Sequence, residues 1–240
     1  MLVAIGWGAL SAAALLVGAL IAYHLRPSRG AIALVMALGA GLLIGSVSFE
    51  LVDEALKTRT VAAVGLFVLV GAGTFAVGDW LLGRLGGADR KDSGGAQAEG
   101  SALAIVLGSV LDGIPESFVL GLTVLEGGVS VSLLAAVVLS NLPEGMSSSS
   151  GLRVAHWPER RVLLLWSAVI VVSAVAAGLG YALLDPSGGS TGALVQAFAA
   201  GALLAMVATT MLPEAYEIEG LLTGPLVVTG FAVSLTLSAV

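Results

Sequence analysis

Two short motifs place carboxylate side chains in the interior of long apolar runs. The first reads Asp112-Gly-Ile-Pro-Glu116 and the second reads Ser140-Asn141-Leu-Pro-Glu144. The first and last residues of each motif are four apart, so a helix places both on one face. The two motifs together offer three carboxylates, one amide and one hydroxyl to a common site.

The prolines of these motifs, Pro115 and Pro143, loosen the helices beside the carboxylates. Proline lacks the amide hydrogen and clashes with the preceding turn, so the carbonyl groups of Leu111 and Leu139 lose their usual helical partners. A proline kink could be the whole purpose of each motif, but ionisable groups deep in an apolar run are costly and generally functional. Oxygen ligands of this kind suit a cation, and hard divalent cations best.

The composition requires a lipid environment around these motifs. Hydrophobic residues make up 58% of the 240 residues and charged residues only 11%, whereas an ordinary globular protein has about 25% charged residues. The 10 Lys and Arg residues are outnumbered by 16 Asp and Glu residues, which argues against nucleic-acid binding. The chain has no cysteine, so disulfides, thiolate metal ligands and a cysteine nucleophile are excluded.

Apolar runs of the length needed to span a bilayer, about 20 residues, occur along the whole chain. None of them alternates with the period of two that a membrane barrel requires. We therefore expect an all-α polytopic membrane protein with eight helices, at 2–24, 31–52, 60–83, 101–125, 129–152, 161–184, 191–216 and 221–240. The polar, glycine-rich segment 85–100 is expected to be a mobile loop.

The basic residues predict the orientation of the chain. Lys and Arg gather in the cytoplasmic loops of membrane proteins. If both termini are outside, only Lys57 and Arg59 lie outside, and the other eight are cytoplasmic: Arg26, Arg29, Arg84, Arg90, Lys91, Arg153, Arg160 and Arg161. We expect a multi-pass protein of the cell membrane with both termini outside and the loop 85–100 in the cytoplasm.

The first three runs recur as the last three, 160 residues later. Gly41–Gly45 (GLLIG) lies over Gly201–Ala205 (GALLA), and Glu54-Ala55 lies over Glu214-Ala215. The two copies are five helices apart. Because five is an odd number and successive spans run in opposite directions, the two copies would be upside down relative to each other. Inverted repeats are typical of transporters, with the substrate site at the repeat interface near the midplane. The single domain, 1–240, would then consist of a first repeat, a loop, two central site helices and a second repeat, at 1–84, 85–100, 101–152 and 161–240.

The paired motifs resemble those of the ZIP family of divalent-metal transporters. The run 191–216, with Pro213-Glu214-Ala215 near its end, also resembles its ZIP counterpart. The resemblance covers essentially the whole chain and implies a 3+2+3 arrangement of helices. It also implies import of a divalent metal toward the cytoplasm, with Glu116 and Glu144 in place of the family's metal-bridging glutamates. The metal is the substrate, and no cofactor is expected.

The departures from the ZIP pattern concern the choice of metal. ZIP proteins usually open the first motif with His-Asn, where this chain has Asp112-Gly113, and they often have His, Gln or an acid where Ser140 and Asn141 stand. Zinc favours nitrogen and sulfur ligands. Manganese, iron(II) or magnesium therefore fits the ligand set Asp112, Glu116, Ser140, Asn141 and Glu144 better, and the metal stays open among these three and zinc.

Further acids stand where the two mouths of a pathway would be. Glu50 and Glu54 end the second run on the outer side, and Glu214 lies near the inner end of the seventh. Acids at helix ends are commonly just solvated, but here they could concentrate cations at each mouth.

Three other functions compete with metal uptake. A proton-coupled exchanger would use the same carboxylates, and a degenerate relative would not transport. An intramembrane protease is not expected, because His24 and His156 lie in loops and Asp79 lies near a helix end. The expected partners are divalent metal ions and the lipid bilayer, with no nucleic acid and with a homodimer as the candidate assembly.

Overall fold

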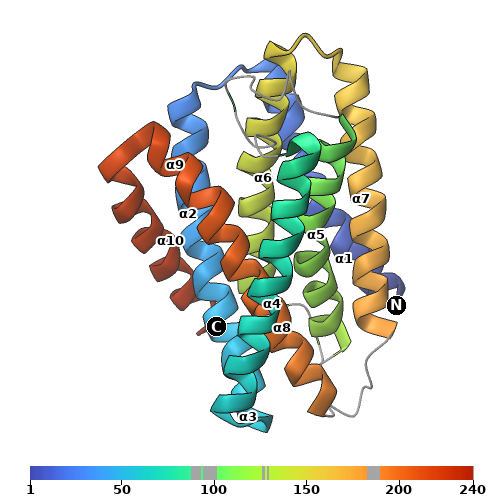
Figure 1. The fold of residues 1–240 in the computed structure, drawn as a ribbon, viewed down its shortest axis with the longest axis vertical. Coiled ribbons are helices and arrows are strands. Elements are labelled where there is room, and N and C mark those ends of the chain that lie inside the picture. The colour runs from blue at the N-terminus through green and yellow to red at the C-terminus, as the bar shows by residue number, and fades with distance from the viewer. Residues whose placement is uncertain (88–92, 94–101, 126–127, 129, 183–189, 240) are drawn as a thin grey trace.

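The computed structural model describes residues 1–87, 93, 102–125, 128, 130–182 and 190–239, and no strand occurs among them (Figure 1). The expectation of an all-α chain is confirmed. The helices are α1 (Leu2–His24), α2 (Arg29–Ser46), η1 (Val47–Val52), α3 (Asp53–Thr58), α4 (Val61–Leu82), η2 (Gly83–Gly87), α5 (Ala102–Leu125), α6 (Val131–Val154), α7 (Glu159–Ala182), α8 (Ser190–Met206), η4 (Val207–Met211), α9 (Leu212–Glu219), η5 (Gly220–Leu222) and α10 (Thr223–Leu237). Segments η1, η2 and η4 are π-helical, and η5 is a 3₁₀ turn.

Several helical stretches are long and apolar enough to cross a membrane. Within the described part of the chain there are six: Leu2–His24, Arg29–Thr58, Val61–Gly86, Leu107–Leu125, Glu159–Ala182 and Thr191–Leu237. The last of them passes through Gly220, whose φ of 57° turns the chain back, so that α10 descends beside α9 (Figure 1). These stretches are compatible with a polytopic membrane protein.

Helix starts follow from short polar caps. The Ser28 hydroxyl accepts a hydrogen bond from the Ala31 amide at the start of α2, and the Thr60 hydroxyl accepts one from Ala63 at the start of α4. Ser130 does the same for α6. Each cap satisfies an amide that the first helical turn leaves without a partner.

Helix α6 is the most enclosed element and lies at the centre of the helix bundle (Figure 1). It packs against α1 and α2, while α1 also packs on α7 and α7 on α5. The outer faces of α4, α7 and α10 expose large apolar side chains, including Leu69, Val171 and Val228. An apolar exterior around a polar central helix is the pattern expected in lipid rather than in water.

Four helix pairs meet through reciprocal glycines. In each pair, a Cβ added to either glycine would collide with a backbone carbonyl of the other helix, so only glycine allows the approach. The contacts are Gly18 with Leu142 and Gly145 with Leu15 (α1–α6), Gly121 with Ala177 and Gly180 with Phe118 (α5–α7), Gly41 with Val227 and Gly230 with Leu38 (α2–α10), and Gly71 with Phe198 and Gly201 with Val68 (α4–α8).

The described connections lie at two opposite ends of the bundle. The α1–α2 and α6–α7 connections and the α9–α10 turn share one end, and the α3–α4 connection lies at the other (Figure 1). The expected mobile loop 85–100 falls mostly outside the described residues. Its Ser93 is described, and the Ser93 hydroxyl accepts a hydrogen bond of 3.0 Å from the Arg29 Nε.

Candidate functional site

Both sequence motifs are buried inside the bundle. In α5, the side chains of Asp112 and Glu116 are each only 2% exposed, and in α6 those of Ser140, Asn141 and Glu144 are 1%, 4% and 4% exposed. Five polar side chains, three of them acidic, are therefore removed from the lipid-facing surface. Such burial costs several kcal/mol for each ion, of the order of 3, unless partners compensate it.

The two motifs are joined directly by a hydrogen bond between Ser140 and Glu116. The Ser140 hydroxyl of α6 lies 3.1 Å from the Glu116 Oε1 of α5 and 3.0 Å from the carbonyl oxygen of Val137. Its single hydrogen is shared between these two acceptors. Glu144 follows Ser140 by one helical turn on the same side of α6. The structure thus brings together the second carboxylate of the first motif and the polar side of the second.

Asn141 is oriented by a different helix. Its Nδ2 donates to the carbonyl oxygen of Ser11 in α1 at 3.3 Å, and the Ser11 hydroxyl donates to the carbonyl of Gly8 at 3.0 Å. An amide coordinates a cation through its oxygen. The hydrogen bond from Nδ2 therefore orients the Asn141 amide and leaves its Oδ1 for coordination. The sequence did not predict a role for α1 in positioning this residue.

Asp112 lies one helical turn before Glu116 in α5. The next residue, Gly113, faces α7, because a Cβ placed there would lie 3.3 Å from the Ser173 Oγ. Asp112, Glu116 and Glu144 all interact with neighbouring groups. Among the described residues, no group of three or more His, Cys, Asp or Glu side chains is arranged to hold a metal ion. A metal bound here would need neutral oxygens in addition to carboxylates.

The motif prolines do not interrupt their helices. Both α5 and α6 continue through Pro115 and Pro143. The carbonyl oxygen of Leu139, whose usual donor would be residue 143, lies against α2, where a Cβ on Gly39 would be 2.6 Å away. The proline therefore releases a carbonyl that packs against the glycine backbone of α2.

A run of serines extends the polar side of α6 beyond Glu144. Ser147, Ser148, Ser149 and Ser150 are at most 4% exposed. The Ser147 hydroxyl donates to the Glu214 Oε1 in α9, and the Trp166 Nε1 of α7 donates to the Ser149 hydroxyl at 2.8 Å. Four consecutive serines within a long helix are visible in the sequence and could have indicated this polar side of α6.

The acids expected at the mouths have different surroundings. Glu214 is partly buried and its carboxylate reaches Ser147, so it continues the polar side of α6 toward the end of the bundle that holds the α1–α2 connection. At the opposite end, Glu50 and Glu54 are partly exposed. Lys57 Nζ lies 2.6 Å from Glu54 Oε2, so part of the negative charge expected there is offset.

A second polar cluster joins three helices near the start of α6. The hydroxyl of Ser46 in α2 lies 2.8 Å from that of Ser132 in α6 and 3.0 Å from that of Ser234 in α10, and Ser238 donates to Ser132 at 3.1 Å. These hydroxyls satisfy one another, which is how polar side chains fasten helices in lipid. The cluster holds α6 in place and carries no charge.

Comparisons with known proteins add no identification. No protein-family model matches the chain, and no curated protein is significantly similar to it in sequence. The resemblance to ZIP transporters therefore depends on the motifs themselves and on the surroundings in which their residues lie.

Proposed function

We propose that the protein is a membrane transporter that moves divalent metal cations toward the cytoplasm through a carboxylate site between α5 and α6. The observation that carries the proposal is the contact between the two buried motifs, in which Ser140 reaches Glu116 at 3.1 Å one turn before Glu144. Acids enclosed by apolar helices are most easily explained by a cation that compensates their charge. The motif resemblance to ZIP transporters supports the same function.

The proposed ligands are all oxygen atoms. They are drawn from Asp112, Glu116, Ser140, Asn141 and Glu144, with one or two of the three acids bound at a time, and all five side chains are buried. Because no three acidic or histidine side chains converge among the described residues, the site suits an ion that accepts one or two carboxylates with neutral oxygens and water. Magnesium and manganese bind in this way, whereas zinc selects nitrogen and sulfur.

An inverted repeat of eight spans in a 3+2+3 order is part of the proposal. The π-helical segments η1 and η4 begin at Val47 and Val207, 160 residues apart. The segments 51–57 and 211–217 share the same succession of buried and exposed residues. In such a repeat α1 corresponds to α7, α2 to α8, α4 to α10 and α5 to α6. The glycine contact α1–α6 then corresponds to α7–α5, and the contact α2–α10 corresponds to α8–α4. All four of these contacts occur. Two related halves explain these coincidences together.

The polar side of α6 supplies a path away from the site. From Glu144 it continues to Ser147, whose hydroxyl meets Glu214 of α9. By the distribution of basic residues, this end of the bundle is cytoplasmic. A cation released from Glu116 and Glu144 would therefore meet further oxygen ligands on its way to the cytoplasm.

Metal uptake by two charge-removing variants tests the proposal. Glu116→Gln and Glu144→Gln keep the size of each side chain but remove a charge from a buried site, so uptake of manganese into proteoliposomes should fall by about 100-fold or more. Glu159→Gln, at an exposed carboxylate beside His24, is the matched control and should transport normally. Normal uptake by both buried variants, with all proteins monodisperse, would exclude this site.

Proton-coupled exchange is the second candidate, and the burial of the acids favours it. Glu116 and Glu144 are only 2% and 4% exposed, so a proton is the natural replacement for a departing metal ion. Manganese flux with and without an imposed pH gradient separates an exchanger from a uniporter. Absence of any metal flux from folded, monodisperse protein would identify a non-transporting relative.

A further inference from the structure

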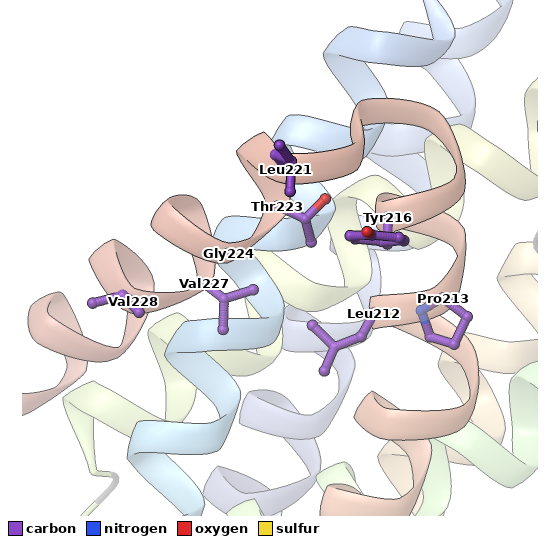
Figure 2. Close-up of a pocket in the computed structure, with 8 residues that line it drawn as sticks. All are labelled: Leu212, Pro213, Tyr216, Leu221, Thr223, Gly224, Val227 and Val228. Atoms are coloured by element: carbon purple, nitrogen blue, oxygen red, sulfur yellow. The ribbon is translucent and has the colours of Figure 1, made fainter.

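Helices α9 and α10 enclose an apolar groove on the outside of the bundle, away from the buried carboxylates. Its volume is about 630 Å³, within the range of sites for small molecules, about 300–1,000 Å³. Figure 2 shows the side chains along the two helices and the turn between them. The lining residues are Leu212, Pro213, Tyr216, Leu221, Thr223, Gly224, Val227 and Val228.

Among the residues that line this groove, Thr223 has a buried polar atom without a hydrogen-bond partner. Thr223 is only 4% exposed, and its hydroxyl oxygen is buried without a hydrogen bond. Other helical threonines, such as Thr209 and Thr229, donate to the carbonyl four residues earlier. Thr223 is the first residue of α10, so it has no preceding turn of its own helix to bond. Figure 2 shows its oxygen on the side of α10 that faces Tyr216. A buried hydroxyl of this kind favours a ligand with an acceptor atom.

The groove also has room for an added side chain. A Cβ built on Gly224 would meet nothing within 4 Å. Below it, the surface of α10 continues as apolar side chains, with Val228, Val233 and Leu235 at 66%, 42% and 52% exposed. This is the kind of surface that hydrocarbon chains cover in a bilayer.

The groove lies where the polar and apolar layers of a bilayer meet. It begins at the α9–α10 turn, at the same end as the α6–α7 connection (Figure 1). Near that end, Arg84 stacks on Trp80 at 3.8 Å and Arg161 on Trp157 at 5.3 Å. Tryptophan and arginine gather at the level of lipid head groups. The exposed Tyr216 at the rim of the groove belongs to the same layer.

We propose that this groove is a binding site for one phospholipid. An ester carbonyl of the lipid accepts a hydrogen bond from the Thr223 hydroxyl, and the acyl chain lies along Val227, Val228 and Leu212. A phospholipid carries an ester oxygen at the top of a long apolar chain. The groove has the matching arrangement, with the Thr223 hydroxyl at the top and apolar side chains of α10 below it. The lipid site does not depend on the proposed metal transport, because it lies on the lipid-facing side of α10. Its occupancy is measured by lipid binding and needs no transport assay.

A photoactivatable lipid tests the proposal. The full-length protein is reconstituted in phosphatidylcholine vesicles that contain a trace of phosphatidylcholine with a diazirine on its acyl chain, and the labelled peptides are mapped by mass spectrometry. We expect labelling of residues 212–228 above that of the lipid-exposed face of α4, which serves as the internal reference. Thr223→Val keeps the shape but removes the donor, and should lower the groove labelling about 2- to 10-fold.

Gly224→Leu should reduce the groove labelling to the level of the reference face, because leucine fills the open space. Gly6→Leu is the matched control, since Gly6 of α1 also has nothing within 4 Å and lies outside the reference face, and it should leave the groove labelling unchanged. All variants are compared as monodisperse protein. Equal labelling of groove and reference in the wild type, or labelling that neither groove variant alters, would overturn the proposal. So would protection of the groove by a second copy of the chain, shown by protein–protein cross-links through residues 212–228.

Discussion

At the scale of single residues, the Ser140 hydroxyl is a contact through which the two motifs meet. It lies 3.1 Å from the Glu116 carboxylate and Ser140 is only 1% exposed. In the proposed metal site, this hydroxyl would either bind the cation or orient a carboxylate that binds it. In both cases its removal would weaken the proposed site without changing the charge, which separates its role from that of the glutamates.

The first prediction concerns this hydroxyl. Ser140→Ala should raise the KM for manganese uptake about 10- to 100-fold, as loss of an orienting partner does at metal sites. Ser167→Ala is the control, because Ser167 is an exposed serine of α7 that donates only within its helix at 2.8 Å. A KM for Ser140→Ala equal to that of the wild type would show that Glu116 is held by its other neighbours.

The second prediction concerns the choice of metal. Asp112 is buried one turn before Glu116, at the position where ZIP transporters usually have histidine. Asp112→His introduces an imidazole, which suits zinc, and removes a negative charge that a hard ion needs. Uptake of zinc and manganese in competition should favour manganese in the wild type and shift toward zinc in the variant. A wild type that already prefers zinc, with no shift in Asp112→His, would show that position 112 does not set selectivity.

At the scale of helices, α6 differs from every other long element. It is absent from the stretches that are apolar enough to span a membrane unaided, yet its residues from Pro143 to Leu152 are all buried. The neighbouring helices α1 and α2 pack against it and help to shield its serines and Glu144. A polar helix of this kind is tolerated in a membrane only inside a bundle. The position of α6 therefore depends more on the helices packed around it than on its own hydropathy.

The third prediction tests the glycine contacts that enclose α6. Gly145→Ala would place a methyl group against the carbonyl oxygen of Leu15 in α1. Overpacking at such a contact costs about 1–3 kcal/mol, so the variant should unfold at a lower temperature in detergent. Gly73→Ala on α4, where a Cβ meets nothing within 4 Å, is the matched control and should be at least as stable as the wild type. Equal melting temperatures for both variants would mean that α1 and α6 are not closely packed at Gly145.

The helical character of the chain and the burial of both motifs could be predicted from sequence, because the apolar runs and the carboxylates inside them can be read directly from the order of residues. The partners of the motif residues could not be predicted in this way. Asn141 bonds to a carbonyl of α1, and Glu214 reaches Ser147 of α6. Such contacts depend on how helices distant in sequence rotate about their axes, and glycines spaced along several helices set that rotation together.

At the scale of the whole molecule, the ends of the bundle differ in charge. Arg26, Arg153 and Arg161 lie in or beside the connections at one end, whereas Lys57 and Arg59 lie at the other, where Lys57 pairs with Glu54 at 2.6 Å. The stacked pairs Arg84–Trp80 and Arg161–Trp157 belong to the first end. Aromatic belts occur at both interfaces of a membrane, whereas Lys and Arg gather on the cytoplasmic side. The basic residues are therefore the feature from which we expect a fixed orientation.

The fourth prediction is that this orientation places both termini outside. The chain has no cysteine, so a single introduced thiol reports its own position. Leu25→Cys, at a residue 75% exposed in the α1–α2 connection, should resist a membrane-impermeant maleimide in intact cells and react after permeabilisation. Thr58→Cys, at an exposed residue that ends α3, should react in both conditions and serves as the control for expression and access. Labelling of Leu25→Cys but not of Thr58→Cys in intact cells would reverse the orientation. The path from Glu144 through Ser147 to Glu214 would then lead outward, and the same buried carboxylates would serve export rather than uptake.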